Sequence, residues 1–283
     1  MVLRRRLDHL AGLYLPADPH DPDAVPSVLI NVAHPLSKQR FTAAHELGHH
    51  VRDKDVSLDQ DTEWFARGEE QGTERERLAE AFAAWFLMPK RLVLSVLADL
   101  GLPADTLDAG GAYALSLALG TSYTATVQHL VDMSMLTGSR ATSLLRLTPQ
   151  TIKKDLGGMD VVTNAWRDVH RLTLTRDEAR VTAQGGDAIL VDAPEIPSSG
   201  YLWGVRAAVD GVVLVRDEYH AQDPDTLGGR GYHRFLFRVE RAGEWEVALE
   251  LRRPWQDAAV DTARVVILAR PRYPSLRGLA RVF

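Results

Sequence analysis

The spacing of apolar and polar residues divides this chain into two halves with different patterns. From about residue 38 to 136, apolar residues recur at intervals of three and four, the period of helices. Residues 74–88 form one uninterrupted run of this kind, which ends before Pro89. Residues 27–32 (SVLINV) form a short apolar run that predicts a strand. From about residue 168 onward, short runs of alternating apolar and polar residues are separated by turn residues, a pattern typical of an all-β sandwich.

These patterns predict a multidomain α+β protein. We expect a mostly helical domain with a helical tail over residues 1–137 and an all-β sandwich over residues 168–283. Residues 138–167 contain Pro149 and the Gly157-Gly158 pair, which are typical of a connecting segment.

Composition narrows the classes of function. The 283 residues include 33 Lys and Arg against 38 Asp and Glu, and the net charge of −5 argues against a domain that coats nucleic acid by charge alone. The chain has no Cys, which excludes disulfides and cysteine nucleophiles and leaves His and carboxylates for a metal site. Asp8, His9 and Pro16 interrupt the basic and apolar start. We therefore expect no secretory signal and no membrane-spanning stretch, and we interpret the protein as soluble and cytoplasmic.

Two histidines stand four residues apart in the segment FTAAHELGHH. On a helix this spacing puts His45 and His49 on one face, where both imidazoles can bind one zinc ion. Glu46 follows the first histidine and can take a proton from an attacking water, whose pKa zinc lowers. The alternative is a polar helix with incidental histidines, but a chance match of this motif is rare. The segment therefore predicts a Zn²⁺ site with Glu46 as the catalytic base.

A catalytic zinc needs a third protein ligand beside an open position. Because the chain has no Cys, this ligand is a downstream His or a carboxylate. The predicted helix 74–88 offers Glu76 and Glu80 near its apolar face, and the periodicity does not separate the two. The alternative for either residue is a solvated surface carboxylate, the usual place of Glu.

The segment RFTAAHELGHH, followed by E-x-x-A-x-x-F-A-x-x-F-L-M-P, resembles the ImmA/IrrE family of metallopeptidases. The resemblance covers about residues 25–137 and implies a zincin-like fold. In that family the glutamate three positions before the Ala is the third zinc ligand, and it maps onto Glu76. The family usually has Asn directly after the Ala, where this chain has Glu80. The resemblance implies a zinc-dependent endopeptidase that cleaves a helix-turn-helix repressor, in a stress response or in mobile-element induction.

Residues 112–136 admit a second interpretation, a helix-turn-helix that binds DNA, with Thr121 and Ser122 capping its second helix. A DNA-reading helix normally carries basic residues for phosphate and guanine. This one would carry Tyr123, Thr124, Thr126, Gln128 and His129, and it contains no Lys or Arg. We therefore expect a helical core here and no direct DNA binding.

Three turn-rich segments lie between the predicted strands of the β half, and a sandwich can gather such loops at one end. Gly, Pro and Ser also dominate ordinary turns. Aromatic residues and Arg carry much of the energy of protein interfaces, however, and they accompany these loops. The candidate protein-binding residues are Pro197, Ser198, Ser199, Gly200, Gly229, Gly231, Arg253, Pro254 and Trp255.

These segments resemble the loops of chagasin-like inhibitors of papain-type cysteine peptidases, over about residues 168–271. That family has an immunoglobulin-like fold and binds through a Pro-Thr-Thr-Gly loop, a Gly-rich loop and an Arg-Pro-Trp loop. The corresponding residues here are 197–200, 228–231 and 253–255.

The loops also depart from the family pattern. Ile196 replaces the usual Asn, Ser198 and Ser199 replace the two Thr, and Arg230 interrupts the glycines. The resemblance therefore supports the fold better than it supports inhibition. The alternative function is a protein-binding module that captures a cysteine peptidase or another partner, with a secondary metal site. Whether the β domain recruits, inhibits or autoinhibits stays open at this point.

Overall fold

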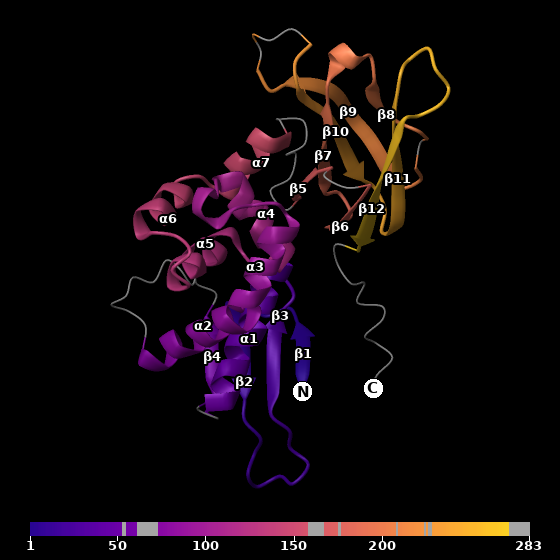
Figure 1. Ribbon diagram of the computed structural model, residues 1–283. Coiled ribbons are helices and arrows are strands. Elements are labelled where there is room, and N and C mark those ends of the chain that lie inside the picture. Colours follow the sequence, from indigo (N-terminus) through magenta and orange to yellow (C-terminus); the bar gives the residue numbers. More distant parts are fainter. Residues whose placement is uncertain are drawn as a thin grey trace. The chain divides into compact units, whose positions relative to one another are not determined.

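The computed structural model describes residues 1–52, 55–60, 73–157, 167–174, 177–207, 209–223, 225 and 228–271 (Figure 1). These residues contain seven α-helices and three four-stranded sheets, which confirms the predicted α+β class. The chain divides into two compact units, Met1–Pro149 and Gln150–Phe283. Residues 158–166 of the predicted connection and 272–283 of the predicted β domain lie outside the described residues.

The first unit begins with a four-stranded sheet in the order β1-β3-β2-β4. Its strands are β1 (Val2–Arg5), β2 (Leu10–Leu15), β3 (Ser27–Asn31) and β4 (Ser57–Gln60). Of these four strands, the sequence pattern predicted only β3. The prediction of helices throughout residues 38–136 was wrong at β4, which is a strand. Strands of four residues, such as β1 and β4, are too short to show an alternating pattern. The side chain of Asn31 holds the turn between β1 and β2, because its Nδ2 donates to the carbonyls of Leu7 and Leu10.

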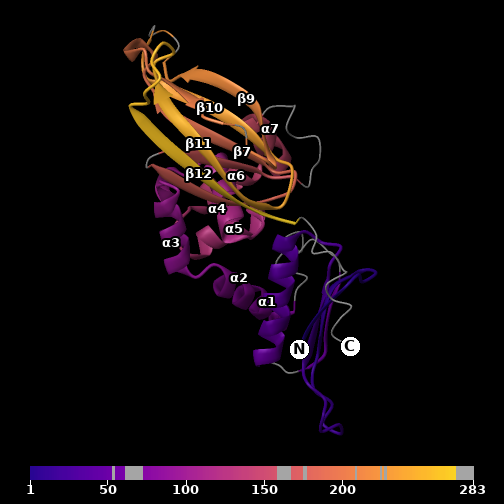
Figure 2. The same ribbon diagram turned by 90° about the vertical axis from the view of Figure 1, so that its right-hand side faces the viewer.

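Helix α1 (Leu36–Arg52) packs on one side against β2 and β3 and on the other against α2 (Glu74–Leu87), as Figure 2 shows. Small residues allow both close approaches. A Cβ on Gly12 of β2 would lie 2.3 Å from Cγ2 of Thr42, and one on Gly48 of α1 would lie 3.3 Å from Cα of Ala79. The middle of α1 is therefore held between a strand and a second helix.

Short helices complete the first unit. They are α3 (Lys90–Asp99), α4 (Ala109–Leu119), α5 (Tyr123–Asp132) and α6 (Gly138–Leu145), and α7 (Pro149–Gly157) follows at the boundary between the units. The α4–α5 pair has the predicted turn, in which Ser122 accepts a hydrogen bond from the amide of Ala125. Tyr123, Thr126 and His129 are buried, and the Tyr123 hydroxyl donates to the carbonyl of Leu144. These side chains of α5 therefore fill the helical core.

No single helix of the described residues has both the length and the apolar composition needed to cross a membrane. Helices α2 and α3 meet that criterion only when they are taken together as a pair, and the chain bends by 43° between them. The criterion considers only length and composition.

The second unit contains two four-stranded sheets, in the orders β5-β7-β10-β9 and β6-β12-β11-β8. Their strands are β5 (Val169–Thr173), β6 (Glu178–Gln184), β7 (Ala188–Glu195), β8 (Leu202–Val205), β9 (Val212–Ala221), β10 (Gly231–Val239), β11 (Gly243–Arg252) and β12 (Asp261–Arg270). Side chains of both sheets share one core, which includes Ile189, Phe235 and Val265. The two sheets therefore face each other, while the immunoglobulin-like and zincin-like folds stay predictions.

Strand β7 is buried on both faces. Leu190 and Leu236 point away from the shared core and pack with Leu156 of α7. Asp192 lies on the same strand, fully buried, 2.7 Å from Arg171 and 2.6 Å from Arg234 on the neighbouring strands. Burial alone would raise the pKa of Asp192, but these two guanidinium groups lower it below its usual value. Through Leu156, helix α7 packs against the face of this sheet that carries Leu190 and Leu236.

Candidate metal centre and binding loops

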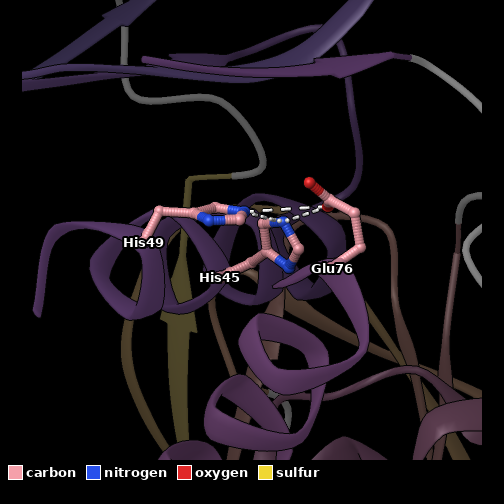
Figure 3. A group of neighbouring side chains, drawn as sticks. All are labelled: His45, His49 and Glu76. Atoms are coloured by element: carbon pink, nitrogen blue, oxygen red, sulfur yellow. Dashed lines mark hydrogen bonds and ion pairs between the residues drawn. The ribbon is translucent and has the colours of Figure 1, made fainter. Parts of the chain in front are cut away.

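Three side chains from two helices converge at one point of the first unit (Figure 3). The helical period puts His45 and His49 on the same face of α1, with their Nε2 atoms 3.0 Å apart. The Oε2 atom of Glu76, in the first turn of α2, lies 3.3 Å from Nε2 of His45 and 3.7 Å from Nε2 of His49. Both histidines are fully buried, whereas 28% of the Glu76 side chain is exposed, so the group is accessible from one side.

The geometry of this group fits a divalent metal ion. Ligand atoms about 2.0–2.1 Å from a tetrahedral zinc lie about 3.3 Å from one another. The three separations here, 3.0, 3.3 and 3.7 Å, bracket that value. Two imidazoles and one carboxylate also form a donor set that leaves a fourth position open. Among the described residues the group contains Glu76 and does not contain Glu80.

The start of α2 fixes the position of Glu76. Thr73 is the N-cap, and its hydroxyl accepts a hydrogen bond from the amide of Glu76. The carboxylate of Glu76 then extends toward α1, where hydrogen bonds with His45 and His49 hold its pKa well below the usual range. The site therefore presents an ionised carboxylate, the form that binds a metal.

Glu46 is fully buried on α1 and lies beside the strand that packs on this helix. A Cβ on Gly12 of β2 would approach Oε1 of Glu46 to 3.2 Å. The absence of a side chain at Gly12 leaves room for this carboxylate. Its role as a catalytic base stays a prediction.

The structure adds contacts that the sequence pattern did not indicate. Nε of Arg75 lies 3.3 Å from Nδ1 of His49, and its Nη2 donates to the carbonyl of Asp55. On the other side of α1, the hydroxyl of Tyr14 lies 2.8 Å from Nδ1 of His50. No spacing in the sequence connects these residues, because each pair joins two elements that only the tertiary fold brings together.

In the second unit, the three predicted loops lie side by side. Nη2 of Arg253 donates to the carbonyl of Ser199 over 3.4 Å, and its guanidinium lies 4.5 Å from the ring centroid of Tyr201. A Cβ on Gly228 would lie 3.0 Å from Cβ of Ser198. Trp255 is 71% exposed beside them. The fold therefore forms one surface from loops that are distant in sequence.

The other candidate residues occupy distinct places in this loop cluster. Pro197 begins a short 3₁₀ helix, Pro197–Ser199, which ends at Gly200 with a φ of 78°. The carbonyl of Gly229 accepts a hydrogen bond from the hydroxyl of Tyr219. Pro254 is exposed in the third loop, whereas Gly231 is buried as the first residue of β10. Gly231 thus belongs to the sheet and not to the exposed part of its loop.

Comparison with known proteins finds a different family model in each unit. A family model described as the IrrE N-terminal-like domain matches residues 1–109. A second model, the Chagasin family peptidase inhibitor I42, matches residues 182–267. The chain joins an IrrE-like domain to a chagasin-like domain. The IrrE-like domain indicates a metallopeptidase, and the chagasin-like domain indicates a protein-binding module.

Three inhibitor-type relatives each match about a third of this chain. Chagasin of Trypanosoma cruzi is 25% identical over 103 residues, which are 35% of this chain and 94% of the relative. A cysteine protease inhibitor from Entamoeba histolytica is 22% identical, with a TM-score of 0.32 over 37% of this chain and 97% of that structure. The solution structure of amebosin is 24% identical, with a TM-score of 0.32 over 37% of this chain and 98% of its own.

Proposed function

We propose that the IrrE-like domain is a zinc-dependent endopeptidase with a narrow protein substrate. The observation that carries this proposal is the convergence of His45, His49 and Glu76. The match to a peptidase-type domain supports it, because the match covers all three residues. Each ligand would contribute one atom, Nε2 from the histidines and a carboxylate oxygen from Glu76.

The chemistry follows from these side chains and their neighbour Glu46. Zinc, when bound, would polarise the scissile carbonyl and acidify the attacking water. Glu46 would accept the proton of that water and deliver it to the leaving amine. The side chain of Glu76 is 28% exposed, so solvent reaches the group of three at this residue.

The resemblance to the ImmA/IrrE family supports a helix-turn-helix repressor as the substrate. Cleavage of such a repressor would release genes of a stress response or induce a mobile element. A repressor substrate also implies that the protein acts in the cytoplasm. We further propose that this chain does not bind DNA directly.

The chagasin-like domain supports a second candidate function, the capture of a protein partner. The joined loops and the exposed Trp255 favour this function. The domain could recruit the substrate, cover the metal centre until a signal displaces it, or bind a papain-like peptidase. The last role is tested by measuring papain inhibition by the full chain and by Trp255→Ala. It requires that the full chain inhibits papain and that the variant does not.

Substitution of Glu46 tests the peptidase. Zinc content and cleavage are measured for the wild-type chain, Glu46→Gln and the matched control Glu80→Gln. The substrates offered are purified helix-turn-helix repressors, taken first from any that the neighbouring genes encode. We expect Glu46→Gln to keep the metal and lose cleavage, and Glu80→Gln to keep both. Normal cleavage by Glu46→Gln would overturn the mechanism, and a zinc-loaded chain that cleaves no repressor would favour the protein-binding function.

A further inference from the structure

A cavity of about 210 Å³ lies beneath the first loop of the chagasin-like domain. Its walls come from the end of β7, the loop itself and the end of β11. The lining residues are Pro194, Glu195, Ile196, Ser199, Tyr201 and Leu251. The volume far exceeds the roughly 10–15 Å³ that one water molecule requires. The cavity can therefore hold a group larger than water.

Glu195 supplies the charged group among these lining residues, and its side chain is 1% exposed. Its Oε2 atom accepts hydrogen bonds from the amide of Trp203, at 2.6 Å, and from Nδ1 of His233, at 3.0 Å. Its Oε1 atom is buried and has no hydrogen-bond partner among the described residues. A buried carboxylate oxygen without a donor costs free energy, so the site favours a ligand that donates a hydrogen bond.

The charges around Glu195 favour a cation. His233 lies between two carboxylates, since its Nδ1 faces Glu195 and its Nε2 contacts Asp217. With His233 protonated, two negative charges and one positive charge leave a net charge of −1 for the three groups. Arg253 is not one of the lining residues, and its guanidinium packs over the ring of Tyr201. The cluster therefore retains a negative charge that a ligand can neutralise.

The rest of the lining is mostly apolar. Pro194, Ile196 and Leu251 surround the space beside the carboxylate. We propose that this cavity binds an alkylammonium group, the chemistry of a lysine side chain. The ammonium donates to Oε1 of Glu195, and the methylene groups contact Ile196 and Leu251. The proposal concerns this cavity alone and does not depend on the peptidase or on inhibition of a cysteine peptidase.

Titration of the full chain with n-butylammonium chloride tests the proposal, with n-butanol as the uncharged control of similar shape. Binding is followed by the NMR shifts of the amides of Trp203 and His233. We expect saturable shifts with n-butylammonium and none with n-butanol. Equal shifts with the two compounds, or no saturable shift, would overturn the proposal.

Variants locate the binding group. Glu195→Gln removes the charge and should weaken binding by about tenfold or more, since hydrogen bonds to charged groups are worth about 1.5–3 kcal/mol. Leu251→Trp fills the cavity without changing the carboxylate and should also abolish binding, which decides the matter if Glu195→Gln fails to fold. Glu218→Gln changes an exposed carboxylate of β9 and should bind as the wild type does. Unchanged binding by folded Glu195→Gln or Leu251→Trp would contradict the assignment.

A second ligand distinguishes two sources of the same chemistry. Nα-acetyl-lysine amide carries the alkylammonium on a peptide-like backbone. If it binds more tightly than n-butylammonium, the cavity takes a lysine of a polypeptide; if the two bind equally, it takes a free amine.

Discussion

The Oε2 atom of Glu76 lies 3.3 Å from Nε2 of His45, although the two residues belong to different helices. This approach depends on how closely α1 packs against its neighbours. Gly48 allows contact with Ala79 of α2, and Gly12 allows contact between β2 and Thr42 of α1. The position of the candidate metal ligands thus rests on two glycines that carry no chemistry of their own.

Replacement of Gly12 tests this dependence. In Gly12→Ala the new Cβ would lie 2.3 Å from Cγ2 of Thr42, so α1 must shift. We expect a loss of about 1–3 kcal/mol in the free energy of unfolding, measured by urea denaturation, and weaker zinc binding. Thr42→Ser removes the clashing methyl group and should restore much of the loss in the double variant. Gly138→Ala, which meets no atom within 4 Å, is the matched control and should lose nothing. Wild-type stability and zinc affinity in Gly12→Ala would contradict this account.

Asp192 predicts a dependence of stability on pH. Its pKa is lower in the folded chain than in the unfolded chain, so its contribution is complete above the unfolded value of about 3.9 and is lost as the pH falls through the folded value. Asp192→Asn should cost about 1.5–3 kcal/mol near pH 7, because hydrogen bonds from Arg171 and Arg234 lose a charged acceptor.

The measurement is urea unfolding at several pH values, with hydrogen exchange in β10 to assign the transition. The difference between the wild type and Asp192→Asn should shrink below about pH 4. Glu240→Gln, in an exposed pair with Arg238, is the control and should follow the wild type throughout. A difference that stays constant from pH 7 to pH 3 would show that the charge of Asp192 is not the cause.

Helix α7 should belong to the stable unit that contains the chagasin-like domain. Leu156 packs against Leu190 and Leu236, and Lys153 pairs with Asp168 at 2.9 Å. We expect fragment 150–283 to fold alone, because its core is complete within it, and to be more stable than fragment 168–283. Thermal unfolding of both fragments and of Leu156→Ala in the longer one is the measurement.

Leu156→Ala should remove most of the advantage of the longer fragment, about 2 kcal/mol, since a partly buried leucine lies at the low end of such losses. Equal stability of the two fragments would mean that α7 contributes nothing to this unit.

The sequence predicted features that a local period controls. The spacing of His45 and His49 determines their common face on any helix, and the structure brings both to Glu76, which the family resemblance favoured over Glu80. The alternating runs after residue 168 likewise predicted strands, and in one of them, β10, the structure places Phe235 and Phe237 in the core. In each case the information lies within a few consecutive residues.

Features that depend on tertiary contact were not predictable in this way. The alternating pattern does not indicate strand β6, whose residues are mostly half-exposed and which pairs in parallel with β12. The contact of Arg75 with His49 and the pairing of Glu195 with His233 join residues that no period relates. Residues 138–157 contain α6 and α7 within the predicted connection, because Pro149 and the glycines there mark helix ends as readily as linkers.

The central claim is that His45, His49 and Glu76 hold one zinc ion, and a zinc titration against a competing chelator tests it most directly. The wild-type chain, Glu76→Ala and Glu80→Ala are compared. Loss of a group that merely orients a ligand costs about 10–100-fold in metal affinity, so loss of a ligand itself should cost more. We predict one zinc per wild-type chain, a loss of more than about 100-fold for Glu76→Ala and near wild-type affinity for Glu80→Ala. Equal losses in the two variants, or a larger loss in Glu80→Ala, would contradict the account.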